Sequence, residues 1–105
     1  MYTVPVYHVP VIKSFADATT KDIYNGDNTK AARRIDKKIW SIVARKLDIL
    51  NAAINLNDLK SPGKQLERLK QDCTGYWSIR VNDQYRIIFR FGNGDALEVR
   101  CRDIH

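Results

Sequence analysis

Apolar and polar residues alternate between Tyr76 and Phe91, in the stretch YWSIRVNDQYRIIFRF. Alternation at every second position is typical of β-strands whose two faces meet different surroundings. It predicts two strands with a shared apolar face and a shared cationic face. The apolar face carries Trp77, Ile79, Val81, Tyr85, Ile87, Phe89 and Phe91. The opposite face carries Tyr76, Ser78, Arg80, Arg86, Ile88 and Arg90.

The loop length between these strands follows from the same pattern. A three-residue loop over 82–84 pairs Val81 with Tyr85 and Arg80 with Arg86, which keeps each face consistent. A two-residue loop would mix the faces. Like charges directly opposite each other are mildly destabilising. We therefore expect an anion outside the sheet, first of all a polyanion, to balance these arginines.

Two helices are predicted ahead of this hairpin. Asp17 is a candidate N-cap for a short helix through Tyr24, which the sequence Asn25-Gly26 would end. A second, long helix is expected over residues 29–54, because apolar residues recur there at spacings of three and four. This stripe consists of Ile35, Ile39, Ile42, Val43, Leu47, Leu50 and Ile54.

The remaining segments read as strands and turns. We expect strands at 11–15, 65–70 and 96–105, with breaks at Pro62-Gly63 and at GNGD over 92–95. The fold class is therefore α+β: a small antiparallel β-sheet of about four or five strands with two N-terminal helices packed on one face. Strict alternation in the last strand groups Leu97, Val99, Cys101, Asp103 and His105. Residues 1–10 read as an N-terminal extension of uncertain origin, and residues 11–105 as a single domain.

The chain is basic, with a formal net charge of +6 over 105 residues. Such a balance favours a nucleic acid, an acidic protein or an anionic membrane as partner, although ordinary solubilising charge would also explain it. Cys73 and Cys101 could form a disulfide or stay reduced, as in a cytosolic protein. No signal peptide and no apolar run of membrane-spanning length is present, so we expect a cytoplasmic protein with no membrane association.

Candidate chemistry lies in the C-terminal sheet segment. The only histidines are His8 and His105, so we expect no metal and no cofactor. A metal-free reaction that suits a basic surface is RNA cleavage by attack of a ribose 2′-OH on the adjacent phosphate. It needs a base, cations for the charge on the phosphate and an acid for the leaving oxygen. The candidate groups are Glu67, Lys70, Arg80, Arg86, Arg90, Asp103 and His105.

The same region resembles the C-terminal half of HigB-type toxins in the RelE/ParE superfamily. It has their Pro-Gly turn, the strand motif LERLK, the hairpin motif GYWSIRVNDQYRI, a strand start GDA and a terminal Asp-x-His. With VIKSFAD matching the usual beginning of these proteins, the resemblance covers about residues 11–105. Where the family commonly ends Asp-Tyr-His, this chain has Ile104, which cannot supply the tyrosine hydroxyl. This departure bears on the efficiency or base preference of cleavage.

The resemblance implies a ribosome-dependent mRNA endonuclease that acts in the bacterial ribosome and is silenced by a cognate helix-turn-helix antitoxin of HigA type. It implies that Arg86 contacts the scissile phosphate and that Lys70 binds phosphate. Asp103 and His105 match the catalytic terminal residues, and Glu67 stands where relatives have histidine or glutamate. Arg86 also suits the role chemically, because a guanidinium can donate two parallel hydrogen bonds to a phosphate.

Other roles stay open at the level of sequence. Arg80 and Arg90 could hold an RNA backbone or simply keep the sheet soluble, and Tyr76 is the better candidate for base stacking than Trp77, which we expect in the core. Cys101 is most simply a small core residue. Two rival functions remain: a ParE-like inhibitor of DNA gyrase without catalysis, and a basic nucleic-acid-binding regulatory module.

Overall fold

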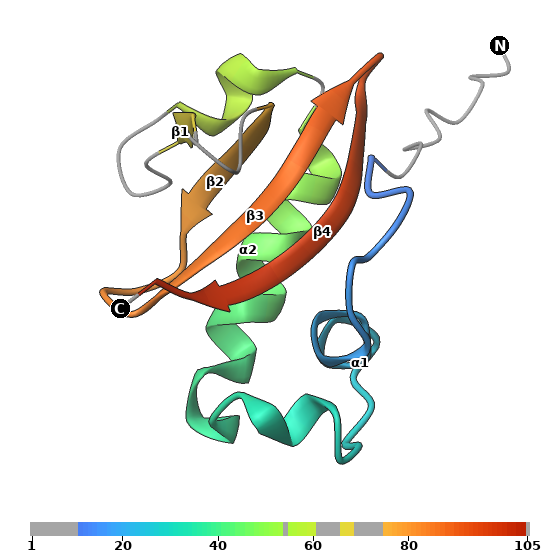
Figure 1. Ribbon diagram of the computed structural model, residues 1–105, viewed down its shortest axis with the longest axis vertical. Coiled ribbons are helices and arrows are strands. Elements are labelled where there is room, and N and C mark those ends of the chain that lie inside the picture. The colour runs from blue at the N-terminus through green and yellow to red at the C-terminus, as the bar shows by residue number, and fades with distance from the viewer. Residues whose placement is uncertain (1–10, 54, 61–65, 69–74, 105) are drawn as a thin grey trace, which may run out of the picture.

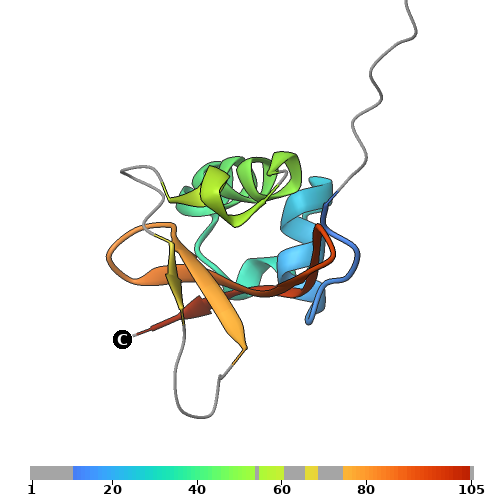
Figure 2. The same cartoon turned by 90° about the horizontal axis from the view of Figure 1, so that it is seen from above.

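Two helices cover one face of a four-stranded antiparallel sheet in the computed structural model (Figures 1 and 2). The structure describes residues 11–53, 55–60, 66–68 and 75–104. The helices are α1 (Ala18–Asn25) and α2 (Trp40–Ala52). The strands lie in the order β1 (Glu67–Arg68), β2 (Tyr76–Arg80), β3 (Tyr85–Gly92) and β4 (Asp95–Asp103). This arrangement confirms the predicted fold class. No helix in these described ranges is long and apolar enough to cross a bilayer.

The core lies between the helices and the inner face of the sheet, as the alternating pattern predicted. Fully buried side chains come from α2 and from all three long strands. They include Val43, Leu47, Leu50, Ile79, Ile87, Phe89, Ala96 and Val99. The opposite face of the sheet, which we call the outer face, has no described helix packed on it (Figure 2).

Helix α1 begins and ends where its capping residues predicted. The Asp17 carboxylate accepts a hydrogen bond from the Thr20 N–H at 2.8 Å, and Gly26 takes the left-handed conformation that ends the helix. Thr20 is fully buried, and its hydroxyl accepts a hydrogen bond from the Cys101 N–H at 2.8 Å. This bond ties α1 to β4, two elements that lie far apart in the sequence.

The prediction of one long helix over residues 29–54 is wrong for the first part of that range. Only Trp40–Ala52 is α-helical; Ala32–Arg34 and Lys37–Ile39 form two short 3₁₀ turns. Between these turns the backbone of Ile35 is extended, which lets its side chain enter the core. The Asp36 carboxylate then accepts a hydrogen bond from Lys38 N–H and starts the next turn. Ile35 thus fits the three- and four-residue spacing of the apolar stripe although it lies between two turns and not in a helix.

The first hairpin has the predicted register. Arg80 lies opposite Arg86 and Ile79 opposite Ile87 across the three-residue loop. The predicted GNGD turn is also present: β3 ends at Gly92, β4 begins at Asp95, and the two residues between them both have positive φ.

Strict alternation fails within β4, because the register with β3 shifts by one residue between Ile88 and Arg90. The extra residue is Glu98, whose φ is +54°. The shift places Val99 and Cys101 in the core but leaves Leu97 opposite Arg90. The predicted grouping of Leu97 with these two residues is therefore wrong.

The predicted strand at 11–15 is present only as two isolated parallel bridges to β4, Ile12 with Ala96 and Phe15 with Val99. Backbone hydrogen bonds accompany both bridges, including Ala96 N–H to Val11 O at 2.7 Å and Ala16 N–H to Val99 O at 2.8 Å. The segment therefore covers the free edge of β4 without forming a fifth strand. Pro62-Gly63 and the ends of the strand predicted at 65–70 lie outside the described residues.

Candidate functional site

A row of three arginines crosses the outer face of the sheet. Arg86 on β3 lies opposite Arg80 on β2 and opposite Arg102 on β4. We call the polar side chains on this face of these strands the arginine face: Tyr76, Ser78, Arg80, Arg86, Arg90, Arg100 and Arg102. Alternation predicted the members from β2 and β3. The prediction named no member from β4, although alternation around the core residue Cys101 places Arg100 and Arg102 on this face.

Arg86 is the most constrained member of the arginine face. Its Nε donates to Ser78 Oγ at 2.7 Å, and its Nη2 donates to the backbone oxygen of Ser78 at 3.3 Å. Its Nη1 lies 3.9 Å from Glu67 Oε1. Only 7% of Arg86 is exposed, so it is not the surface cation that its polar position would indicate. Burial lowers the pKa of Arg86, while the Glu67 charge acts in the opposite direction.

Acidic side chains of the chain itself balance the predicted cations. Arg80 pairs with Asp83 in the hairpin loop, and Arg90 Nη1 lies 3.1 Å from Glu98 Oε2. Glu67, the predicted base, lies on β1 beside Arg86, and 63% of its side chain is exposed. Carboxylates within the protein therefore partly balance these arginines, and the anion expected outside the sheet stays a prediction. An incoming phosphate would exchange with these carboxylates rather than meet bare cations.

Tyr76, the candidate for base stacking, belongs to a separate cluster on the arginine face. Its hydroxyl donates to Glu98 Oε1 at 2.8 Å, and the Arg90 guanidinium lies 5.9 Å from its ring centroid. The hydrogen bond to Glu98 raises the pKa of Tyr76. Hydrogen bonds from Tyr76 and Arg90 lower the pKa of Glu98. The ring of Tyr76 is thus engaged by a cation, and its hydroxyl by a carboxylate.

The predicted terminal residues lie at the end of β4. Asp103 is opposite Tyr85, on the helix side of the sheet, and its carboxylate accepts a hydrogen bond from Gln84 Nε2 at 2.9 Å. It therefore faces away from Arg86, although both lie at the same end of the sheet. The next residue, Ile104, is half exposed, and its N–H donates to Gln84 O at 2.9 Å. Lys70 and His105 lie outside the described residues.

The other singled-out residues belong to the core. Trp77 is half-buried against the apolar cluster, with the Arg68 guanidinium 5.7 Å from its ring centroid. Cys101 is a buried free thiol, and burial raises its pKa to about 12. Both predictions of core positions are confirmed. Within the described ranges, no three His, Cys, Asp or Glu side chains gather in a way that could hold a metal ion.

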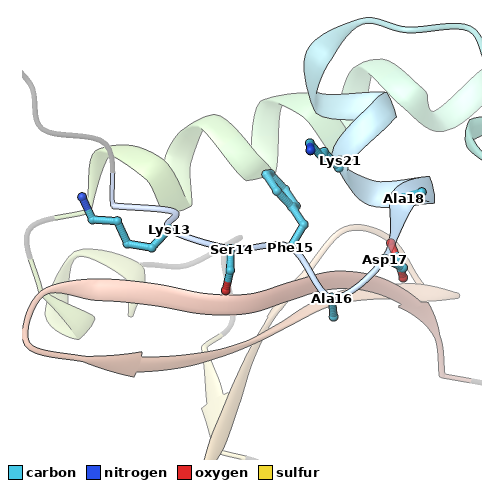
Figure 3. A pocket seen from close by; sticks show the side chains of 7 residues that line it. All are labelled: Lys13, Ser14, Phe15, Ala16, Asp17, Ala18 and Lys21. Carbon is cyan, nitrogen blue, oxygen red and sulfur yellow. The ribbon is translucent and has the colours of Figure 1, made fainter.

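A hollow of about 540 Å³ lies beside the start of α1 (Figure 3). Its lining includes Lys13 and Lys21, together with Ser14 and Asp17. The Ser14 hydroxyl already accepts the N–H of Glu98, and Asp17 already caps α1. The uncharged and acidic polar groups of this hollow therefore serve the fold, and its described lining contains none of the predicted catalytic residues.

Comparison with known proteins identifies the family. A family model described as the RelE-like toxin of type II toxin-antitoxin system HigB matches residues 13–105. The chain belongs to the HigB-like toxins. This HigB-like toxin is 42% identical to Toxin HigB-1 of Vibrio cholerae over 84 residues, which cover 79% of this chain and 86% of that protein. It is 32% identical to Endoribonuclease HigB of Proteus vulgaris over 97 residues, which cover 90% of this chain and all of that protein.

Solved structures confirm the fold of the HigB-like toxin. A chain of the YoeB-YefM complex from Staphylococcus aureus matches with a TM-score of 0.55 at 20% identity, over 90% of this chain and 97% of that chain. The YoeB/ParE toxin from Agrobacterium tumefaciens matches with a TM-score of 0.52 at 22% identity, over 89% and 99% of the two chains. The family model and the two HigB relatives confirm the resemblance inferred from the motifs, and membership of a type II system implies an antitoxin partner.

Proposed function

We propose that this HigB-like toxin is an endoribonuclease that cleaves mRNA on the bacterial ribosome. In this proposal the ribose 2′-OH attacks the adjacent phosphate without a metal ion, and a helix-turn-helix antitoxin of HigA type silences the toxin. The relative named Endoribonuclease HigB, aligned over its full length, supports the activity. The basic arginine face supports a polyanionic substrate.

The observation that carries the proposal is the fixed orientation of Arg86. A guanidinium held by Ser78 before substrate arrives can stabilise charge on a phosphate without first losing side-chain freedom. The planar fork of arginine matches two phosphate oxygens at once. Arg80 and Arg102 flank Arg86 on the neighbouring strands and would steer the RNA backbone toward it.

Four further residues complete the proposed reaction. Glu67 lies within reach of Arg86 and would accept the 2′-OH proton. His105 would supply the proton to the leaving 5′-oxygen, since an imidazole titrates near neutral pH. Asp103 faces away from Arg86, so it would act through His105 rather than at the phosphate. Lys70 would add a second cation at the phosphate. Arg80, Arg90 and Tyr76 would bind flanking RNA.

The test is a cleavage assay with mRNA alone and with mRNA loaded on bacterial ribosomes. Arg86→Ala should lower the cleavage rate by about 10²–10³, as expected when one preorganised donor is removed. Arg34→Ala is the matched control, because it removes the same charge from an exposed 3₁₀ turn outside the arginine face. His105→Ala tests the proposed acid.

Cleavage only on ribosomes, with cyclic-phosphate ends and with losses in Arg86→Ala and His105→Ala alone, would support the proposal. Intact mRNA in every sample, with folded protein by circular dichroism, would overturn it. Inhibition of DNA gyrase would then be the function to measure. Equal losses in Arg86→Ala and Arg34→Ala would reduce Arg86 to a general contribution of charge.

A further inference from the structure

Glu98 has a backbone conformation that residues other than glycine rarely adopt. Its φ of +54° lies in the left-handed region, which glycine or asparagine usually occupies. The residue forms the register shift between β3 and β4, in the middle of the longest hairpin of the sheet. Unfavourable backbone conformations of this kind persist where the surrounding structure enforces them, and they gather at functional positions.

The N-terminal segment enforces this conformation. The Glu98 N–H donates to Ser14 Oγ at 2.8 Å, and the next N–H, that of Val99, donates to Ser14 O at 3.0 Å. Ser14 therefore holds both sides of the bulge. Figure 3 shows its side chain directed at β4. The result is a carboxylate directed across the arginine face.

The two carboxylate oxygens of Glu98 each meet one donor, as two oxygens of a phosphate would. Oε1 accepts from the Tyr76 hydroxyl and Oε2 accepts from Arg90 Nη1. The side chains of Glu98 and Arg90 are 45% and 55% exposed, so a ligand can reach the pair. An exposed ion pair contributes little to stability. Stability alone is thus a poor reason to maintain a left-handed glutamate here.

We propose that the Glu98 carboxylate occupies a phosphate-binding site of the arginine face, and that RNA must displace it from Arg90 and Tyr76. The inference rests on the proposed function and adds a means of limiting how tightly RNA is bound. Glu98 would weaken RNA binding at this position and thereby favour release of the cut strand. Glutamate is ionised at neutral pH, and the hydrogen bonds from Tyr76 and Arg90 lower the pKa of Glu98 further, so it competes as an anion. Arg100, which also lowers that pKa, adds positive charge to the site.

The test measures binding of a single-stranded RNA whose riboses carry 2′-O-methyl groups, so that it cannot be cleaved. Fluorescence anisotropy at several salt concentrations gives the affinity and its salt dependence. Glu98→Gln should bind several-fold more tightly than the unaltered protein. Its plot of log K against log salt should be steeper by about 0.7, the contribution of one further phosphate contact on a single strand.

Two controls separate this site from overall charge. Asp27→Asn makes the same change in net charge at an exposed residue after α1, and should alter the affinity little. In an Arg90→Gln background, Glu98→Gln should give no gain, because the cation that it would free is absent. Ser14→Ala keeps every charge but loosens the bulge, and should raise the affinity in the same direction.

Equal affinities of Glu98→Gln and Asp27→Asn would overturn the inference. A gain that persists without Arg90 would do the same. If ribosomal cleavage is observed while these affinities are equal, only the inference fails and the proposed function stands. If neither the unaltered protein nor Glu98→Gln binds RNA at low salt, the inference fails, and the ribosomal cleavage assay alone then decides the proposed function. Tighter binding of an acidic peptide but not of RNA by Glu98→Gln would assign the face to a protein partner instead.

Discussion

Ser78→Ala tests whether one buried hydroxyl orients Arg86. Ser78 is fully buried, and its Oγ accepts the hydrogen bond from Arg86 Nε at 2.7 Å. The substitution removes this acceptor but leaves the backbone oxygen of Ser78 and the nearby Glu67 carboxylate in place. The Nε–H of Arg86 then loses this acceptor in a site from which water is largely excluded.

The expected cost follows from these contacts. Hydrogen bonds to charged groups contribute about 1.5–3 kcal/mol. Because two of the contacts of Arg86 survive, we expect the free energy of unfolding to fall by about 2 kcal/mol. With a urea dependence of about 1–3 kcal/mol per molar, the midpoint of urea unfolding should fall by about 1 M. RNA cleavage should fall as well, because Arg86 gains rotamers that do not point at the phosphate.

Urea unfolding monitored by circular dichroism gives the stability, and the ribosomal cleavage assay gives the rate. Ser41→Ala on the exposed side of α2 is the matched control and should change neither quantity. A double-mutant cycle with Arg86→Met isolates the pairwise contribution. A loss of stability no larger than that of Ser41→Ala, or additive effects in the cycle, would refute the idea that Ser78 holds Arg86.

Three shorter predictions concern the scaffold. Thr20→Val leaves the Cys101 N–H unpaired in the core and should lower the free energy of unfolding by about 1–3 kcal/mol; an unchanged melting temperature would contradict this. Gly94→Ala should cost about 1 kcal/mol, because φ is +79° there, whereas Gly92→Ala, with open space and no positive φ, should cost less in the same urea titration. Burial raises the pKa of the Cys101 thiol from 9.0 to about 12, so the unfolded state loses this proton first and stability should fall as pH rises through this window. Between pH 8 and pH 10, the free energy of unfolding from urea titrations should fall less in Cys101→Ala than in the unaltered protein. Equal falls in the two proteins would contradict this prediction.

Local patterns were enough to predict the elements that local interactions determine. The hairpin register followed from keeping two faces consistent, and it placed Arg80 opposite Arg86 as observed. The limits of α1 followed from Asp17 and Gly26, because capping depends on residues within one turn of the helix end. Membership of the family followed from motifs that are each short but occur in a fixed order.

Features that depend on distant partners were not predictable from the pattern. Glu98 bulges because Ser14 binds its N–H, a contact across 84 residues, and this bulge determines which β4 side chains reach the arginine face. Ile35 kept helical spacing although its backbone is extended. The burial of Arg86 depends on how its side chain folds back onto Ser78, which alternation cannot specify.

The contacts between the N-terminal segment and β4 also determine when the protein can finish folding during its synthesis. Val11 bonds Ala96, Ser14 bonds Val99, and Thr20 bonds Cys101, so the first described elements pair with some of the last. Translation adds about 5–20 residues per second, and early segments leave the ribosome long before late ones. The bulge at Glu98 and the outward turn of Arg100 therefore cannot form until β4 has emerged. A nascent chain thus cannot assemble the arginine face before its own translation has passed β4.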